Sequence, residues 1–289
     1  MISKDTFFSK KITLNCRGKL LDLSVPRVMG ILNVTPDSFY DGGRYVEEDK
    51  IKRRIDQLLS DGADIIDIGA YSSHPGASEV KQDEEKKRLI PSLIYIRKQY
   101  PDAIISVDTF RAEVAGMAIS EYEIDMVNDI SAGQADPLMM ETLAQYSVPY
   151  IMMHMQGTPA TMQDNPVYHN VVKDIITFFA ERIHTASAFG LKDIIIDPGF
   201  GFGKTIQHNF QLLHGLKAFS VFELPVMAGL SRKSMIYKSL EIAPAESLNG
   251  TTVLNTLALL NGASLLRVHD VKEARETIRL FQAYQGAGG

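Results

Sequence analysis

The feature that most constrains this 289-residue chain is a unit that occurs eight times, a short apolar run followed by a longer, mostly amphipathic segment. The runs cover residues 28–34, 64–70, 103–109, 125–131, 149–155, 193–199, 225–231 and 264–270. Continuous apolar runs are typical of parallel strands covered on both faces, and glycines at the ends of the longer segments are typical of helix C-termini. Eight such units predict an α/β fold, a (β/α)8 TIM barrel. A doubly wound open sheet uses the same alternation and is the alternative.

Residues 11–24 have a different pattern, a period of two around Arg17-Gly18, which predicts an N-terminal β-hairpin. We expect this hairpin to close the bottom of the barrel. No linker interrupts the pattern, so we expect one domain over residues 1–289, with 286–289 as a tail. The polar segments 35–45 and 72–89 follow the first two strands, and long loops at these places are usually functional.

The overall composition excludes several classes of protein. The net charge is −5 and no cluster of Lys and Arg stands out, so a nucleic-acid-binding surface is not expected. No apolar stretch is long enough to span a membrane or to act as a signal peptide. Cys16 is the single cysteine, which excludes an internal disulfide and fits a reducing compartment. We therefore expect a cytoplasmic protein.

The stretch IIIDPGFGFGKT (194–205) resembles a nucleotide-binding loop at first sight. A P-loop, however, needs glycine where this chain has Pro198, and the dinucleotide pattern needs glycine where it has Lys204. The stretch is better interpreted as a strand that ends at Asp197 and leads into a glycine-rich loop. The role of Lys204 is left open, with a salt bridge as the simplest expectation.

A polar residue stands at the carboxyl end of every predicted strand. These residues are Asn33, Asp67, Asp108, Asn128, His154, Asp197, Ser231 and the pair Arg267 and His269. In a barrel they converge on one mouth, which predicts a polar small-molecule site. Asp and Asn side chains complement the edge of a flat heterocycle such as a purine or a pterin.

Basic side chains after the seventh and eighth strands indicate an anionic group on the ligand. They are Arg232, Lys233, Arg267 and His269, and Ser234 begins a predicted helix whose N–H groups attract anions. The spacing of His and Asp fits no zinc site, and no Ser-His-Asp triad is required. These residues alone do not define the reaction.

Eight stretches of the chain, in order, resemble the dihydropteroate synthase family nearly end to end. They are MGILNVTPDSF (29–39), DIGAYSSHPGA (67–77), ISVDT (105–109), VNDIS (127–131), MHMQGTPATMQ (153–163), DPGFGFGK (197–204), GLSRKS (229–234) and LRVHD (266–270). The resemblance implies a TIM barrel of folate biosynthesis, usually a homodimer and a sulfonamide target. Such a transferase joins 6-hydroxymethyl-7,8-dihydropterin diphosphate to p-aminobenzoate with Mg²⁺ and releases diphosphate.

The resemblance also implies a role for each matching residue. The pterin would be bound by Asp108, Asn128, Met153, Asp197, Lys233 and Arg267. The p-aminobenzoate site would comprise Thr35, Pro36, Phe39, Pro75 and Ser234. The diphosphate would contact Asn33, Ser73, His74, Arg267 and His269, and Asn33 would also hold the metal. The catalytic residues would be Asn33, Lys233, Arg267 and His269.

One departure from the family pattern keeps two alternatives open. The second loop of the family usually reads S-T-R-P-G, but here His74 stands in the place of the arginine and Tyr71 in the place of a preceding glutamate. Histidine lacks both the bidentate fork and the permanent charge of arginine. His74 is then either a variant that modestly changes the kinetics of a synthase, or the mark of a non-catalytic pterin-binding paralogue. Apart from this departure, a pterin-dependent methyl transferase on the same fold is a further alternative, although it has no need of NVTPDSF or SRKS.

Overall fold

A computed structural model describes residues 12–35, 44–71, 80–158, 161–162 and 165–287. Its centre is a sheet of eight parallel strands in the order β8-β7-β6-β5-β4-β3-β10-β9. The strands are β3 (Arg27–Asn33), β4 (Ile65–Gly69), β5 (Ile104–Asp108), β6 (Met126–Asp129), β7 (Tyr150–Met153), β8 (Ile194–Asp197), β9 (Met227–Ala228) and β10 (Leu265–Val268). Each strand lies within, or one residue outside, a predicted apolar run.

The two ends of the sheet meet and close it into a barrel. Ile196 on β8 forms a parallel bridge with Val226, the residue before β9, and its N–H donates to the carbonyl of Pro225 at 3.0 Å. A doubly wound open sheet has two free edges, so this contact decides between the two predicted folds. The predicted TIM barrel is confirmed.

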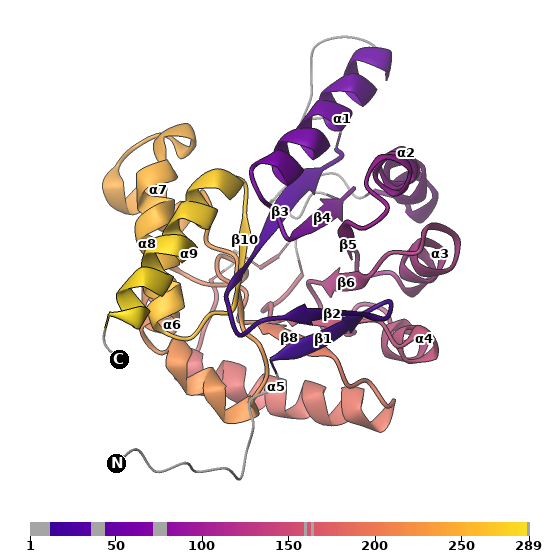
Figure 1. The fold of residues 1–289 in the computed structure, drawn as a ribbon. Helices are drawn as coiled ribbons and strands as arrows, with labels where there is room; N and C mark the ends of the chain where they lie inside the picture. Colours follow the sequence, from indigo (N-terminus) through magenta and orange to yellow (C-terminus); the bar gives the residue numbers. More distant parts are fainter. Residues whose placement is uncertain (1–11, 36–43, 72–79, 159–160, 163–164, 288–289) are drawn as a thin grey trace.

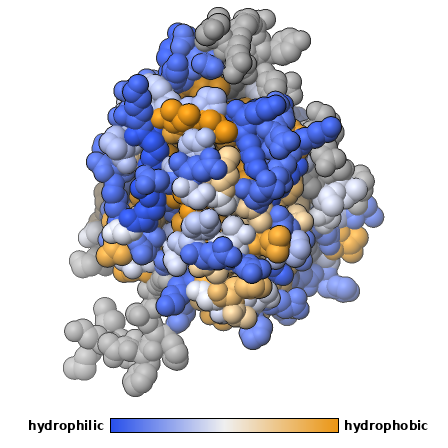
Figure 2. Space-filling view, turned by 90° about the vertical axis from the view of Figure 1, so that its right-hand side faces the viewer, coloured by the Kyte–Doolittle hydropathy of each residue, from blue (hydrophilic) through white to orange (hydrophobic). Residues whose placement is uncertain are grey.

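The helices surround the barrel in chain order (Figure 1). They are α1 (Arg44–Ser60), α2 (Gln82–Gln99), α3 (Ala112–Tyr122), α4 (Met139–Tyr146), α5 (Val171–Ala188), α6 (Ile206–His214), α7 (Ser234–Leu240), α8 (Leu248–Leu260) and α9 (Val271–Gly286), with short 3₁₀ segments at Leu216–Phe222 and Pro244–Glu246. Within the described part of the chain, no helix is both long and apolar enough to cross a bilayer. The side formed by α2, α3 and α4 is largely hydrophilic, with scattered apolar residues (Figure 2).

Two predicted boundaries are wrong. Residues 82–89 were expected to continue a polar loop, but they form the first half of α2. The acidic residues Asp83 and Glu84 lie in its first turn, where they interact favourably with the helix dipole, so their polarity does not indicate a loop. Gly286 was assigned to the tail, but it is the last residue of α9.

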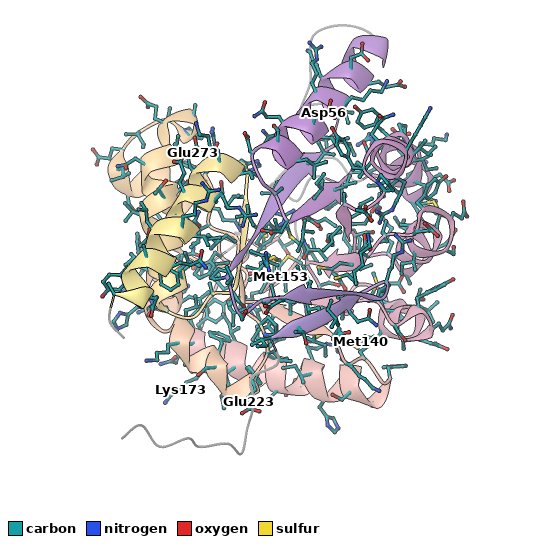
Figure 3. The ribbon with its side chains drawn as sticks, in the orientation of Figure 1. Asp56, Met140, Met153, Lys173, Glu223 and Glu273 are labelled. Carbon is teal, nitrogen blue, oxygen red and sulfur yellow. The ribbon has the colours of Figure 1, made fainter. Side chains whose placement is uncertain are left out.

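The bottom of the barrel is filled by one inward-facing residue from every strand. These residues are Met29, Ile65, Ile104, Met126, Ile151, Ile195, Met227 and Leu265. Four apolar residues of the hairpin pack against them, namely Leu14, Cys16, Leu21 and Leu23. Figure 3 shows side chains filling the space inside the ring of strands, with Met153 near its centre. The hairpin therefore closes the bottom, as predicted.

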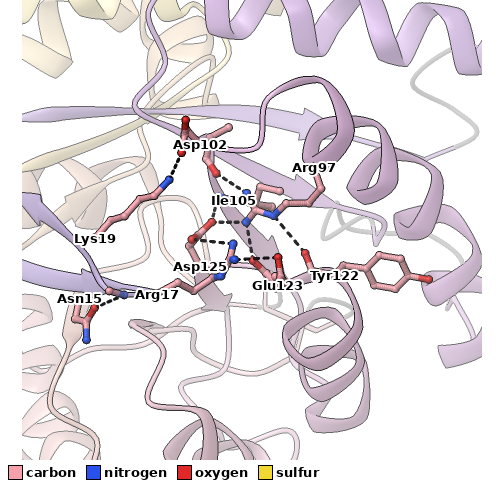
Figure 4. Close-up of polar contacts among 11 residues, drawn as sticks. Asn15, Arg17, Lys19, Arg97, Asp102, Ile105, Tyr122, Glu123 and Asp125 are labelled. Atoms are coloured by element: carbon pink, nitrogen blue, oxygen red, sulfur yellow. Dashed lines mark hydrogen bonds and ion pairs between the residues drawn. The ribbon is translucent and has the colours of Figure 1, made fainter.

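The hairpin consists of β1 (Thr13–Cys16) and β2 (Lys19–Asp22), joined at Arg17 and Gly18. Both turn residues have positive φ angles, 52° and 83°, as a two-residue type I′ turn requires. Arg17 contacts the carboxylates of Glu123 at 2.9 Å and Asp125 at 3.7 Å on the underside of the barrel (Figure 4). These contacts join the hairpin to the face that in TIM barrels serves stability rather than catalysis.

Candidate active site

Above the apolar bottom layer, the next layer of inward-facing side chains in the lumen is mostly polar. Inward positions recur every second residue along a strand. Two residues beyond the bottom layer, the inward side chains are Ile31, Asp67, Ser106, Asn128, Met153, Asp197 and Arg267, with Gly229 beyond β9. Of the polar strand ends predicted from the sequence, Asp67, Asn128, Asp197 and Arg267 lie in this layer of the lumen. The prediction is wrong for His154, which faces outward to α5, where its ring centroid lies 4.8 Å from that of Phe178.

Arg267 lies at the centre of this polar layer. Its Nε donates to Oδ2 of Asp67 and its Nη2 donates to Oδ2 of Asp108, both at 2.7 Å. Burial lowers the pKa of Arg267, but the two carboxylates raise it by more, so the net shift is upward. The guanidinium stays charged and has a fixed plane at the mouth, with 20% of its side chain exposed.

Asp67 is a site residue to which the sequence assigned no role. Its side chain is fully buried, and its Oδ2 also accepts from Nδ2 of Asn128 at 3.1 Å. Asp67 thus orients both Asn128 and Arg267. The signal that could have identified it is its inward position two residues above the apolar Ile65, on a strand otherwise made of apolar residues and glycine.

Three buried polar atoms of this layer have no hydrogen-bond partner within the described part of the chain. They are Oδ1 of Asp67, Oγ of Ser106 and Oδ1 of Asn128, which belong to the adjacent strands β4, β5 and β6. Buried polar atoms are rarely left unpaired in folded proteins. The lumen is therefore suited to a polar ligand or to ordered water.

Asp197 and Met153 form the opposite wall of the lumen. They are register partners on β8 and β7, and they are 4% and 3% exposed. Oδ1 of Asp197 accepts from the N–H of Gly199 at 2.8 Å. Burial raises the pKa of Asp197, and the nearby Lys233 opposes that shift.

Lys233 directs its amino group to the same wall. Its Nζ donates to the carbonyl oxygen of Phe200 and lies 4.5 Å from the ring centroid of Phe202. Burial lowers the pKa of Lys233 to about 8, although the carboxylate of Asp197 raises it. A Cβ atom added to Gly229 would lie 3.9 Å from Oδ2 of Asp197 and 4.0 Å from Nζ of Lys233, so the space beside this glycine borders both charged groups.

The predicted basic residues differ in their partners and in their charge. Arg232 forms a bidentate ion pair with Asp270, with distances of 2.9 and 2.6 Å, so a carboxylate offsets its charge, as Asp67 and Asp108 do for Arg267. Burial, reinforced by the charge of Arg267, lowers the pKa of His269 to about 4. His269 is neutral at pH 7 and acts there as a hydrogen-bonding group. Arg267 contributes a permanent positive charge at the mouth, and Lys233 lies near it.

The remaining predicted residues divide into two groups. Asn33 is exposed at the mouth, Thr35 is buried close to it in the chain, and Ser234 is the first residue of α7. The other group, Pro36, Phe39, Ser73, His74 and Pro75, lies outside the described residues.

Asn33 is the predicted metal ligand, and its surroundings fit a magnesium ion held mainly by other groups. A Cβ atom at Gly69 would lie 3.6 Å from both Oδ1 of Asn33 and Cβ of Asp108, so the amide oxygen lies near a carboxylate. Mg²⁺ usually takes one or two protein oxygens and completes its shell with water and substrate phosphates. Among the described residues there is no group of three or more His, Cys, Asp or Glu that could hold a metal without such help.

Fold and site together define an enzyme class, a TIM barrel whose mouth binds a flat polar heterocycle beside an anion. A family model described as "Pterin binding enzyme" matches residues 29–269. A dihydropteroate synthase of Haemophilus influenzae is 43% identical over 95% of this chain and 99% of its own.

Solved structures agree with these matches. The Yersinia pestis dihydropteroate synthase with a sulfonamide drug has a TM-score of 0.88 and 41% identity, covering 95% of this chain and 99% of that one. The Xanthomonas albilineans dihydropteroate synthase with 4-aminobenzoic acid has a TM-score of 0.88 and 39% identity, covering 95% and 98%. This chain belongs to the dihydropteroate synthase family, which are transferases of folate biosynthesis. The predicted family is thereby confirmed, and membership decides against the methyl transferase alternative.

Proposed function

We propose that this chain condenses 6-hydroxymethyl-7,8-dihydropterin diphosphate with p-aminobenzoate to give 7,8-dihydropteroate and diphosphate. The observation that carries the proposal is the charged Arg267, held by Asp67 and Asp108 at the mouth of a lumen that contains unpaired buried polar atoms. That arrangement places an anion-binding group beside a site for a polar heterocycle. Family membership supports the same activity.

The pterin fits the polar layer by hydrogen-bond complementarity. The ring N–H and the 2-amino group would donate to Asp197, whose pKa is raised by burial, and these donors would favour its ionised form. Asn128 offers both a donor and an acceptor, and Lys233 donates to acceptor atoms of the ring. Met153 supplies the apolar wall against the ring face.

The reaction breaks the bond between the exocyclic carbon of the pterin and the diphosphate oxygen. The bonding electron pair leaves with diphosphate, and the remaining carbon is a cation conjugated with the dihydropterin. The amine of p-aminobenzoate attacks that carbon and then loses a proton to solvent, so the reaction needs no strong general base. Asn33 would hold Mg²⁺, which when bound supplies charge neutralisation on the diphosphate.

Protein groups stabilise the departing diphosphate by charge and by hydrogen bonds. Arg267 contributes the permanent charge, and its pairing with two carboxylates fixes its direction before substrate arrives. His269 would donate a hydrogen bond to the diphosphate, whose negative charge would raise the low pKa that His269 has in the free protein. We expect p-aminobenzoate to bind near Thr35 and Ser234, and sulfonamides to compete with it, since the Yersinia pestis relative was solved with such a drug.

We also propose a homodimer formed through α8 and α9, which pack against each other on one side of the barrel (Figure 1). Val253, Leu257 and Leu260 form an exposed stripe on α8, with exposed fractions of 50%, 40% and 47%. Leu280 and Tyr284 on α9 are 74% and 69% exposed. Clustered apolar exposure of this kind is typical of a protein interface.

A cytoplasmic location stays a prediction that the sparing use of cysteine supports.

The deciding experiment measures diphosphate release with Mg²⁺ and dihydropterin diphosphate, with and without p-aminobenzoate. The proposed function predicts that diphosphate and dihydropteroate appear together and only when both substrates are present. Pterin binding without turnover, restored by His74→Arg, would instead identify the non-catalytic paralogue.

A further inference from the structure

Lys204 is a buried basic residue that the proposed reaction does not use. Its side chain is 3% exposed, and its Nζ lies 2.8 Å from the carbonyl oxygen of Gly199 and 3.0 Å from that of Phe202. His154 contributes its carbonyl oxygen at 3.5 Å and its ring Nδ1 at 3.0 Å, which accepts when the ring proton is on Nε2. Lys204 forms no ion pair with any described residue, so the expected salt bridge is wrong. These acceptors are enough for the three N–H donors of a protonated lysine.

The glycine-rich loop is shaped around this amino group. Gly199 and Gly201 have φ angles of 72° and 83°, which other residues rarely adopt. A Cβ atom at Gly199 would lie 1.9 Å from the carbonyl oxygen of His154, so the loop presses directly on the chain after β7. A P-loop directs N–H groups at a phosphate, whereas this loop directs carbonyl groups at a lysine of its own chain.

The same loop holds Lys233. The carbonyl of Phe200 accepts from Lys233, and the ring of Phe202 lies against its amino group. A Cβ atom at Gly201 would lie 3.1 Å from Cδ of Lys233, so the loop also fits closely along that side chain. Lys204 thus binds the carbonyls of Gly199 and Phe202, while Lys233 contacts the neighbouring carbonyl of Phe200 and the ring of Phe202.

We propose that Lys204 is a positioning residue for pterin binding, which fixes the loop at residues 199–203 so that Lys233 points into the lumen. The proposal rests on the proposed function, because it assumes that the ligand of Lys233 is the pterin. Burial lowers the pKa of Lys204 well below its usual value, and the charge of Asp197 opposes that shift. The cage of carbonyl oxygens further favours the protonated form, and Lys204 in turn favours an ionised Asp197.

The test compares Lys204→Met, which removes every donor at nearly the same size, with Lys204→Gln, which keeps two. Tyr168→Phe is the matched control, because the Tyr168 hydroxyl donates to the carbonyl of Gly203 at 2.8 Å in the same loop. The measurements are KM for dihydropterin diphosphate, KM for p-aminobenzoate, thermal midpoint, and the Kd of 6-hydroxymethylpterin by calorimetry.

Lys204→Met is expected to raise the pterin KM and Kd about tenfold or more, since small displacements of binding groups have large effects. Lys204→Gln should give a smaller rise, and neither variant should change the p-aminobenzoate KM by more than about twofold. Tyr168→Phe should lower the thermal midpoint while leaving both KM values near those of the wild type.

Two results would overturn the proposal. One is an unchanged pterin Kd in either Lys204 variant despite a lowered thermal midpoint, and the Gln variant provides this test even if the Met variant does not fold. The other is an equal rise in both KM values. Wild-type turnover tests the proposed function separately, because the calorimetric Kd requires no reaction.

Discussion

Nη2 of Arg267 and Oδ2 of Asp108 lie 2.7 Å apart and join β10 to β5 across the mouth of the barrel. The strands β4 and β3 stand between these two in the sheet, and Arg267 also binds Asp67 on β4. The guanidinium thus has two carboxylate partners that set its plane. The property to test is therefore the planar, two-armed geometry of the Arg267 guanidinium as well as its charge.

Arg267→Lys keeps the charge but loses the fork. We expect kcat/KM to fall about 100-fold, because a lysine cannot bind both carboxylates in one plane while facing the diphosphate. The measurement is steady-state turnover, with the thermal midpoint as a check on folding. Arg275→Lys is the control, since Arg275 binds Asp64 and the carbonyl of Gly62 away from the mouth, and its kcat/KM should match wild type. Equal losses in the two variants would contradict this role for Arg267.

His154 makes stability depend on pH. Burial, and then the charge of Lys204, lower its pKa from 6.5 to about 2, so the folded protein keeps it neutral. The unfolded chain binds a proton at this site below pH 6.5, and the folded chain does not. The contribution of His154 to stability is therefore complete above pH 6.5 and is lost as the pH falls, by about 1.4 kcal/mol per pH unit.

His154→Asn keeps an acceptor for Lys204 and removes this titration. We measure the free energy of unfolding with urea between pH 7.5 and 4.5, and expect it to fall less steeply with falling pH than in wild type. The difference in slope should correspond to the uptake of about one proton on unfolding. Carboxyl groups with raised pKa values, such as Asp197, act with the opposite sign in both proteins and cancel in the comparison. An identical slope for His154→Asn and wild type would refute the assignment.

The hairpin should stabilise the barrel without contributing to turnover. Leu14 is fully buried against the bottom layer, so Leu14→Ala is expected to lower the free energy of unfolding by about 2–5 kcal/mol. Leu20→Ala in the same hairpin removes a side chain that is 74% exposed and should have little effect. Both variants should keep the wild-type kcat at a temperature where they are folded. A loss of kcat in the folded Leu14→Ala protein would show that the bottom face also affects the site.

The proposed dimer surface can be tested by placing a charged side chain on it. Leu257→Glu on α8 should convert the dimer to a monomer in light scattering coupled to size-exclusion chromatography, because a buried carboxylate without a partner is unfavourable. Ile94→Glu on α2 is the control, at an apolar residue that is 52% exposed on the other side of the barrel. A Leu257→Glu protein with the mass of the wild-type dimer would place the interface elsewhere.

Local patterns in the sequence were sufficient for most of the architecture. Continuous apolar runs indicated the strands because a strand buried on both faces has no polar side to show. The alternation around Arg17-Gly18 indicated the hairpin because one of its faces is covered and the other is not. The start of α2 was missed because its buried apolar positions, Leu89, Leu93 and Ile96, begin only after an acidic first turn.

The sequence by itself determined which residues stand at the strand ends, and with them the polar mouth and the family. Tertiary structure alone decided how those residues are paired. Arg267 binds Asp67 across 200 positions, Arg232 is engaged by Asp270, and Lys204 is enclosed by carbonyl oxygens rather than by a carboxylate. The physical reason is that strand periodicity is a local property of the backbone. Which side chains meet in the lumen depends instead on strand register and on closure at Ile196, and neither leaves a local pattern in the chain.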